Sequence, residues 1–114
     1  MKQTFDYLEH VSFAACVCDK EGVVLYQNAR ARRRDGDVVG KNLYGCHNPH
    51  SQAMIRHMIE TGESNTYEII RHGQRRLLQQ TPWYEEEGGP VAGLIELSLD
   101  LPAEYPTFNR DKSE

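Results

Sequence analysis

A cysteine and two histidines stand within five positions of the chain, in the stretch GCHNPHS. Thiolate and imidazole are ligands that zinc prefers, and imidazole also holds haem iron. Cys46, His47 and His50 therefore form a candidate metal or haem site, which Cys16 or Cys18 could complete as a tetrahedral zinc set. Structural zinc sites typically offer two pairs of ligands, however, and this chain has one irregular cluster.

The same stretch also has the features of a helix start. Asn48 is a favourable N-cap and Pro49 suits the first helical position, while Gly62 suits the C-cap. An apolar face recurs at helical spacing between these ends, at Ser51, Met54, Ile55, Met58 and Ile59. His50 and His57 would lie ~10.5 Å apart along the helix axis, so they cannot chelate one ion together.

The composition excludes several classes of protein. The 114 residues carry 13 Lys and Arg against 17 Asp and Glu, a net charge of −4, so nothing favours nucleic acid or an anionic membrane as a partner. No apolar run reaches the ~20 residues of a membrane helix. Three cysteines without a secretion signal predict reduced thiols and a cytoplasmic protein.

Hydrophobic alternation and turn residues predict five strands, at residues 12–18, 23–28, 65–71, 75–84 and 91–101. A short lead-in helix is expected at residues 3–10, and short-helix and loop material follows the second strand. The fold class is therefore α+β, with a five-stranded antiparallel sheet and helices on one face. We expect a single domain at residues 1–101 and a poorly ordered tail at residues 102–114. The arginine-rich run at residues 30–34 is expected to be a solvated helix face.

The order of these segments resembles that of a PAS domain over roughly residues 4–101. VCDKEGVVLYQN is similar to the first hairpin of that family, with Asp19 and Gly22 flanking the turn and Asn28 following it. VVGKNL, ETGES and VAGLIELSLDL resemble the stretch before the long helix, the end of that helix and the closing strand. Leu101 and Pro102 depart from the family pattern after Asp100.

A narrower likeness concerns CHNPHS and GLIELSLD. They are similar to a bacterial PAS subgroup found beside hemerythrin-like domains, which carries Cys-His-Pro-Pro-x-Ser and Gly-x-Leu-Glu-Val-Thr at the matching places. Asn48 replaces the first of the two prolines here. This subgroup implies no particular ligand.

The resemblance bears on which cofactors to expect. Leu43 occupies the place of the photoreactive cysteine of flavin-binding PAS domains, which argues against a light sensor. The haem-ligating position of oxygen-sensing PAS domains corresponds to Ser51, and His50 is one residue away. One residue turns a helical side chain by ~100°, away from the pocket. No cofactor is required by the sequence, and haem or a metal at the Cys46/His47/His50 cluster stays an alternative.

Two sets of residues follow from strand alternation combined with the resemblance. The predicted ligand pocket contains Cys16, Cys18, Tyr26, Cys46, His47, Met54, Glu96 and Ser98. His47 or Tyr26 is the expected partner of the Glu96 carboxylate, which must be paired or hydrated. The opposite, apolar sheet face predicts an interface between two copies of the chain, at Phe13, Ala15, Val17, Ile95, Leu97 and Leu99.

The sequence thus predicts a non-enzymatic sensory or signal-transduction module. It would bind a small ligand or a signalling partner protein and act as a homodimer, with no role for nucleic acid or a membrane. An enzyme is disfavoured because no nucleophile, base and orienting group are spaced to act together.

Overall fold

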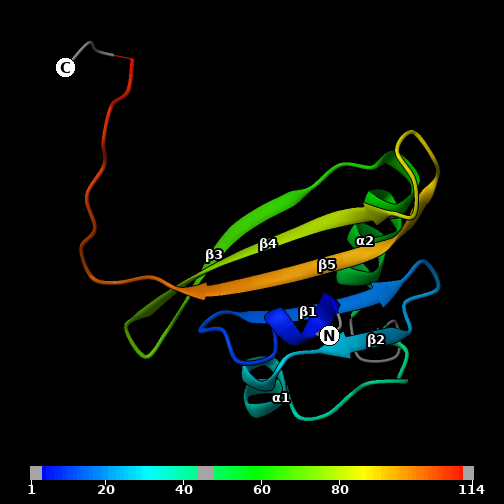
Figure 1. The fold of residues 1–114 in the computed structure, drawn as a ribbon, viewed down its shortest axis with the longest axis horizontal. Helices are drawn as coiled ribbons and strands as arrows, with labels where there is room; N and C mark the ends of the chain where they lie inside the picture. The colour runs from blue at the N-terminus through cyan, green and yellow to red at the C-terminus, as the bar shows by residue number, and fades with distance from the viewer. Residues whose placement is uncertain (1–3, 44–47, 112–114) are drawn as a thin grey trace.

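The computed structural model describes residues 4–43 and 48–111. Its elements follow in the order η1 (Thr4–Tyr7), β1 (Ala14–Asp19), β2 (Val24–Gln27), α1 (Ala29–Asp35), α2 (Pro49–Thr61), β3 (Asn65–Arg71), β4 (Gln74–Tyr84) and β5 (Val91–Asp100). The five strands form one sheet in the order β2-β1-β5-β4-β3, and each neighbouring pair is antiparallel (Figure 1). The predicted α+β class and five-stranded antiparallel sheet are confirmed.

The turn between β1 and β2 is held by the carboxylate that precedes it. Asp19 Oδ1 accepts hydrogen bonds from the backbone N–H groups of Glu21 and Val23, at 2.9 and 3.0 Å. Gly22 has a positive φ of 88°, a conformation that a glycine adopts without strain. The Asp and Gly of the predicted hairpin therefore act as turn residues.

Helix α2 begins and ends as its sequence predicts. The side chain of Asn48 accepts a hydrogen bond from the Ser51 N–H at 2.9 Å, and Pro49 follows as the first helical residue. Gly62 ends the helix in the left-handed conformation. On the helix face that meets the sheet, Ile55 and Met58 are buried against Cys18 and Leu94.

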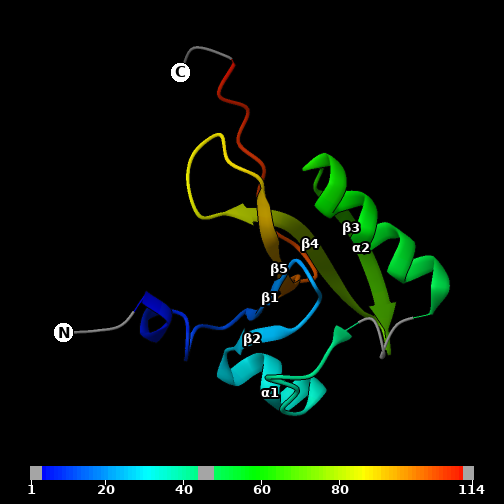
Figure 2. The same ribbon diagram turned by 90° about the vertical axis from the view of Figure 1, so that its right-hand side faces the viewer.

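The two faces of the sheet have different neighbours. We call the face that carries Cys16, Leu94 and Glu96 the inner face, and α2 packs on this side. The opposite, outer face carries Ala15 and Leu97, which are directly paired between β1 and β5. The N-terminal segment lies on the outer side of β1 and β2, across the sheet from α2 (Figure 2). Residues of both α1 and α2 border a space on the inner side of the sheet.

Asn28 ties the N-terminal segment to the sheet. Its side chain is fully buried, and its Oδ1 accepts from the N–H groups of Ala15 and Ala31 at 3.1 and 3.0 Å. Its Nδ2 donates to the carbonyl oxygens of Leu8 and Phe13, both at 2.9 Å. One side chain therefore caps α1, bonds β1 and fixes the lead-in segment.

The chain leaves the sheet after β5 as an extended segment. Residues 102–111 contain no helix or strand and are exposed, and they run away from the body of the domain (Figure 1). The division into a domain at residues 1–101 and a tail at residues 102–114 stays a prediction.

Within residues 4–43 and 48–111, no helix combines the length and the apolar character needed to cross a lipid bilayer.

Candidate functional site

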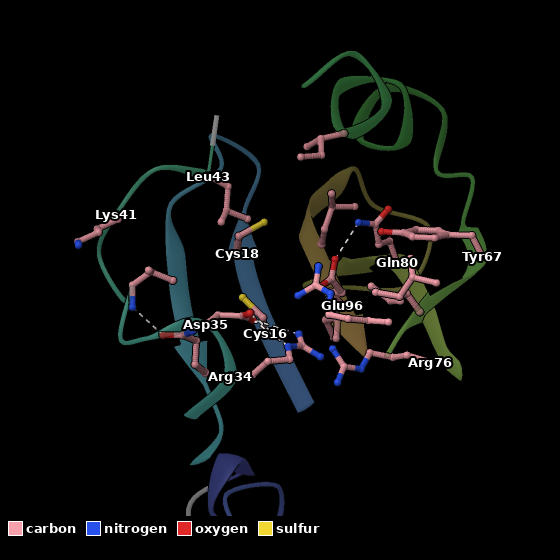
Figure 3. Close-up of a pocket in the computed structure, with 18 residues that line it drawn as sticks. Cys16, Cys18, Arg34, Asp35, Lys41, Leu43, Tyr67, Arg76, Gln80 and Glu96 are labelled. Atoms are coloured by element: carbon pink, nitrogen blue, oxygen red, sulfur yellow. Dashed lines mark hydrogen bonds and ion pairs between the residues drawn. The ribbon is translucent and has the colours of Figure 1, made fainter. Parts of the chain in front are cut away.

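A cavity of about 490 Å³ lies between the inner face of the sheet, α1, the segment after α1 and α2. Figure 3 shows strands β1 and β2 on one side of it and β3, β4 and β5 on the other. Its walls comprise Cys16, Cys18, Gln27, Arg34, Asp35, Val38, Lys41, Leu43, Ile55, Tyr67, Ile69, Arg71, Arg76, Leu78, Gln80, Leu94, Ile95 and Glu96. Apolar walls with a few convergent polar groups are typical of small-molecule sites, and the volume falls in the usual range.

Strand register places a polar row across the inner face. Cys16 pairs with Glu96, Glu96 with Gln80, and Gln80 with Asn65, so these side chains stand side by side on four strands. Asn65 Nδ2 donates to Gln80 Oε1 at 3.1 Å, and Gln80 Nε2 donates to Glu96 Oε2 at 2.8 Å. The hydrogen bonds along this row end at the carboxylate of Glu96, which lines the cavity (Figure 3).

Among the described residues, Glu96 has a partner that was not expected, and the expected partner His47 lies outside these residues. The hydrogen bond to Glu96 comes from Gln80 on β4, whereas Tyr26 lies on the other side of the sheet. Burial, and then the charge of Glu96, raises the pKa of the Tyr67 phenol, which also lines the cavity. Glu96 is therefore an acceptor near Cys16 and Tyr67, with one carboxylate oxygen engaged by Gln80.

Cys16 stands next to this carboxylate as a protonated thiol. Burial, together with the charge of Glu96, raises the pKa of Cys16 to about 12. Burial also raises the pKa of Cys18, and both cysteines are free. Because only the thiolate is a strong nucleophile or metal ligand, these two side chains serve as small packing groups at neutral pH.

Cationic side chains gather at the opposite end of the cavity from α2. Arg34 of α1 donates to Ser98 Oγ and forms an ion pair with Asp35 at 3.0 Å. Arg76 of β4 donates through Nε to Asp100 Oδ1 at 2.8 Å. The side chains of Arg34 and Arg76 reach toward one another from the two sides (Figure 3).

The guanidinium of Arg34 stays charged in this setting. Burial lowers the pKa of Arg34, but the hydrogen bond to Asp35 and the charges of Asp35, Glu96 and Asp100 raise it above its ordinary value. The predicted solvated run at residues 30–34 is thus wrong in part. Arg32 pairs with Glu9 at 2.8 Å, and Arg34 reaches the inner face of the sheet.

The structure places some of the predicted pocket residues in or beside the cavity and others elsewhere. The structure places Cys16, Cys18 and Glu96 on the cavity wall, and Ser98 on the same face as the partner of Arg34. Met54 is 37% exposed and lines a shallower hollow beside the cavity, which shares Ile55, Tyr67, Gln80 and Glu96 with it.

The predicted place of Tyr26 in the pocket is wrong. Tyr26 pairs with Val17 of the outer face, and the charges that act on its phenol come from Glu9, Arg32 and Asp6. The inner-facing neighbour on β2 is Gln27 instead, which pairs with Cys16 and lines the cavity.

The candidate metal cluster falls mostly outside the described residues, since Cys46 and His47 belong to the segment 44–47. His50 is exposed and lines a surface hollow with His57, away from the main cavity. Among residues 4–43 and 48–111, no three His, Cys, Asp or Glu side chains come close enough to hold a metal ion. A site that includes Cys46 and His47 stays a prediction.

Some of the predicted interface residues are buried within one molecule, and others remain accessible on the outer face. Ala15 and Val17 are 1% and 5% exposed, because the N-terminal segment already covers β1 within one molecule. They are therefore not available to a second copy, and Phe13 is half-buried beside them. On β5, Ile95 and Leu97 are half-buried and Leu99 is exposed on the outer face.

Comparison with known families decides the classification. The model of a family described as the PAS fold matches residues 8–105. The chain belongs to the PAS fold family. Among curated proteins, none matches this PAS domain in sequence. PAS domains are typically sensory modules, which agrees with the sensory role predicted from the sequence.

Several solved structures share the fold. VqmA of Vibrio cholerae, described as a dimer and a LuxR-type receptor, is 21% identical with a TM-score of 0.66, over 89% of this chain and 52% of that one. A structure of VqmA bound to DPO is also 21% identical, with a TM-score of 0.66, over 85% of this chain and 56% of that one. This PAS domain thus spans about half the length of those VqmA chains.

Two further structures are similar along most of their own length. A PAS domain from Colwellia psychrerythraea is 18% identical with a TM-score of 0.64, over 84% of this chain and 92% of that one. A sensory box sensor histidine kinase from Vibrio cholerae is 17% identical with a TM-score of 0.62, over 85% of both chains. At these identities the likeness shows the fold and no more.

Several cavity residues were missed at the level of sequence. Leu78 and Gln80 on β4 and Tyr67 on β3 face inward because side chains alternate between the two faces of a strand. The alternation rule that placed Cys16 and Glu96 would have found them too. Arg34 gave no such signal, because its contact with Ser98 joins residues 64 positions apart.

Proposed function

We propose that this PAS domain is a non-enzymatic sensory module that binds a small organic molecule in the cavity between the sheet and the helices. The cavity itself carries the proposal, since it combines an apolar wall with the polar row that ends at Glu96. The structure of VqmA bound to DPO supports it, because there a protein of related fold holds a ligand.

The absence of catalysis is part of the proposal and follows from the groups in the cavity. Cys16 is held as a thiol by its raised pKa, and Glu96 is bonded to an amide, which cannot pass on a proton. Among the described residues, the cavity wall contains no histidine to serve as a base. A binding role therefore suits these side chains better than acid–base or nucleophilic chemistry.

Filling the cavity tests the binding role. In ligand-observed NMR with a library of small organic fragments, we expect a subset to bind the wild-type protein and to lose binding in Cys16→Trp, whose indole would occupy the space beside Glu96. Leu99→Trp adds the same side chain to the outer face and is the matched control, so it should keep every hit. Thermal unfolding would verify that both variants are folded.

The proposal is contradicted by a library without hits, or by hits that persist unchanged in a folded Cys16→Trp variant. Either result would show that the inner face does not hold small molecules.

We further propose that two copies of the domain associate through the part of the outer face that the N-terminal segment leaves uncovered. This part contains Leu77, Ile95, Leu97 and Leu99, with Ile70 at its edge, 70% exposed. An exposed apolar patch of this kind usually marks an interface. VqmA, of related fold, is described as a dimer, which supports a second copy as the occupant.

Leu99→Glu would place a charge in the centre of this patch. We expect light scattering after size exclusion to give a dimer for the wild type at tens of micromolar and a monomer for Leu99→Glu, because burying an unpaired carboxylate is costly. Val39→Glu changes an apolar side chain of similar exposure, 49% against 41%, in the segment after α1, and should stay dimeric. A wild-type monomer at that concentration would refute this part.

A further inference from the structure

The charge of the cavity wall is opposite to that of the chain. The whole sequence carries −4, whereas the wall contains Arg34, Lys41, Arg71 and Arg76 against Asp35 and Glu96. A concave surface with an excess of one sign of charge, and with low-dielectric walls, concentrates ligands of the opposite sign. The cavity is therefore built to attract anions, although the protein as a whole repels them.

The acidic residues near this end are already engaged. Asp35 pairs with Arg34 at 3.0 Å, and Asp100 is shared between Arg30 and Arg76 at 2.7 and 2.8 Å. Within the described residues, the side chain of Arg71 has no hydrogen bond or ion pair, and the side chain of Arg76 uses only its Nε. The guanidinium N–H donors of Arg71, and those of Arg76 other than Nε, are therefore available at the cavity wall to bind an anionic group.

Strand register brings these two arginines together. Ile69 pairs with Arg76 between β3 and β4, and Arg71 follows Ile69 by two residues on the same face. Such diagonal neighbours are ~7–8 Å apart, within reach of long side chains. Arg71 and Arg76 also line a second hollow of about 270 Å³ beside the main cavity. Two adjacent guanidinium groups favour an anion that accepts bidentate hydrogen bonds between them.

We infer that the ligand is a small organic carboxylate, whose carboxylate binds at Arg71 and Arg76 and whose apolar body lies along the wall toward α2. Ile69, Leu78 and Leu94 supply that wall, and the oxygen of Glu96 not used by Gln80 can accept a hydrogen bond from a donor on the ligand. Because Glu96 is itself an anion in the same wall, a singly charged ligand fits better than a dianion. This inference rests on the proposed function of the cavity.

Isothermal titration calorimetry with 3-phenylpropionate and with its neutral amide, 3-phenylpropanamide, tests the inference. We expect the acid to bind at least about tenfold more tightly than the amide, since charge-assisted hydrogen bonds are stronger than neutral ones. Arg71→Gln and Arg76→Gln should each remove most of this preference and leave the affinity for the amide unchanged. Added salt should weaken binding of the acid alone.

Arg75→Gln provides the matched control. Arg75 is the neighbour of Arg76, but it lies on the outer face and pairs with Glu68 at 2.7 Å. The variant changes the net charge by the same amount, so it should keep the preference for the acid. If Arg76→Gln does not fold because it has lost its ion pair with Asp100, the Arg71→Gln variant alone tests the preference for the acid. The side chain of Arg71 has no partner to lose among the described residues.

The outcomes separate this inference from the proposed function. Equal affinities for the acid and the amide would overturn the claim that the ligand binds through a carboxylate. The cavity would still be a binding site. Displacement of the acid by inorganic phosphate at equal concentration also overturns the inference, because an apolar body would then contribute nothing. Absence of binding by the acid, the amide and every library fragment overturns both.

Discussion

Replacing Gly93 by alanine is expected to destabilise the domain by at least about 3 kcal/mol, or to prevent folding. A Cβ at this position would lie inside van der Waals contact with the backbone carbonyl of Cys18 and 2.9 Å from Asp19 Cα. Trp83 closes the same space from β4, since its Nε1 donates to the Cys18 carbonyl at 2.9 Å. The Cys18 carbonyl and Asp19 Cα cannot move away without separating β1 from β5. Urea unfolding followed by circular dichroism measures the loss.

Gly89 supplies the control for this substitution. A Cβ there would meet the flexible side chain of Glu86 at 2.9 Å and the Glu86 carbonyl oxygen at 3.3 Å, in the exposed turn before β5 that can adjust. Gly89→Ala should therefore change the free energy of unfolding by no more than about 0.5 kcal/mol. A Gly93→Ala protein as stable as this control would show that β1 and β5 are not packed as described.

Replacing Asn28 by alanine is expected to cost about 3 kcal/mol or more. The variant loses four hydrogen bonds and leaves the N–H of Ala15 and the carbonyl of Phe13 without this partner, each of which costs ~1–3 kcal/mol unless water reaches it. The Leu8 carbonyl keeps its bond from the Val11 N–H. Hydrogen exchange should also become faster across residues 8–13, because Asn28 Nδ2 holds that segment on the sheet.

Asn48→Ala is the matched comparison, since Asn48 is also an N-cap but is exposed, and its side chain bonds to the Ser51 N–H among the described residues. We expect it to cost about 1 kcal/mol. Equal losses for the two asparagines would mean that Asn28 acts only as a helix cap and does not anchor the N-terminal segment.

The parts of the fold that the sequence predicted are those set by local interactions. Caps at Asn48 and Gly62, the Asp19 turn and the alternation of β5 depend on neighbours a few residues away, and all are found. The inner placement of Cys16 and Glu96 follows from the same period of two along a strand.

The errors come from register and from tertiary contacts. Pairing shifts between Val17 and Cys18, so that Cys18 faces Val24 and not Leu25, and this irregularity sets which residues of β2 face inward. Tyr26 could not be assigned to a face without it. Burial of Ala15 and Val17 likewise depends on the N-terminal segment crossing the sheet, and the reach of Arg34 to Ser98 depends on where α1 docks.

Methyl-resolved NMR during titration with the tightest fragment of the library tests the central claim most directly. If the cavity is the binding site, the methyl signals of Ile55, Leu78 and Leu94 shift with a single Kd while those of Leu97 and Leu99 on the outer face stay in place. Shifts confined to the outer face, or signals of the inner face that do not move at saturating fragment, would contradict the claim that this PAS domain binds its ligand between the sheet and the helices.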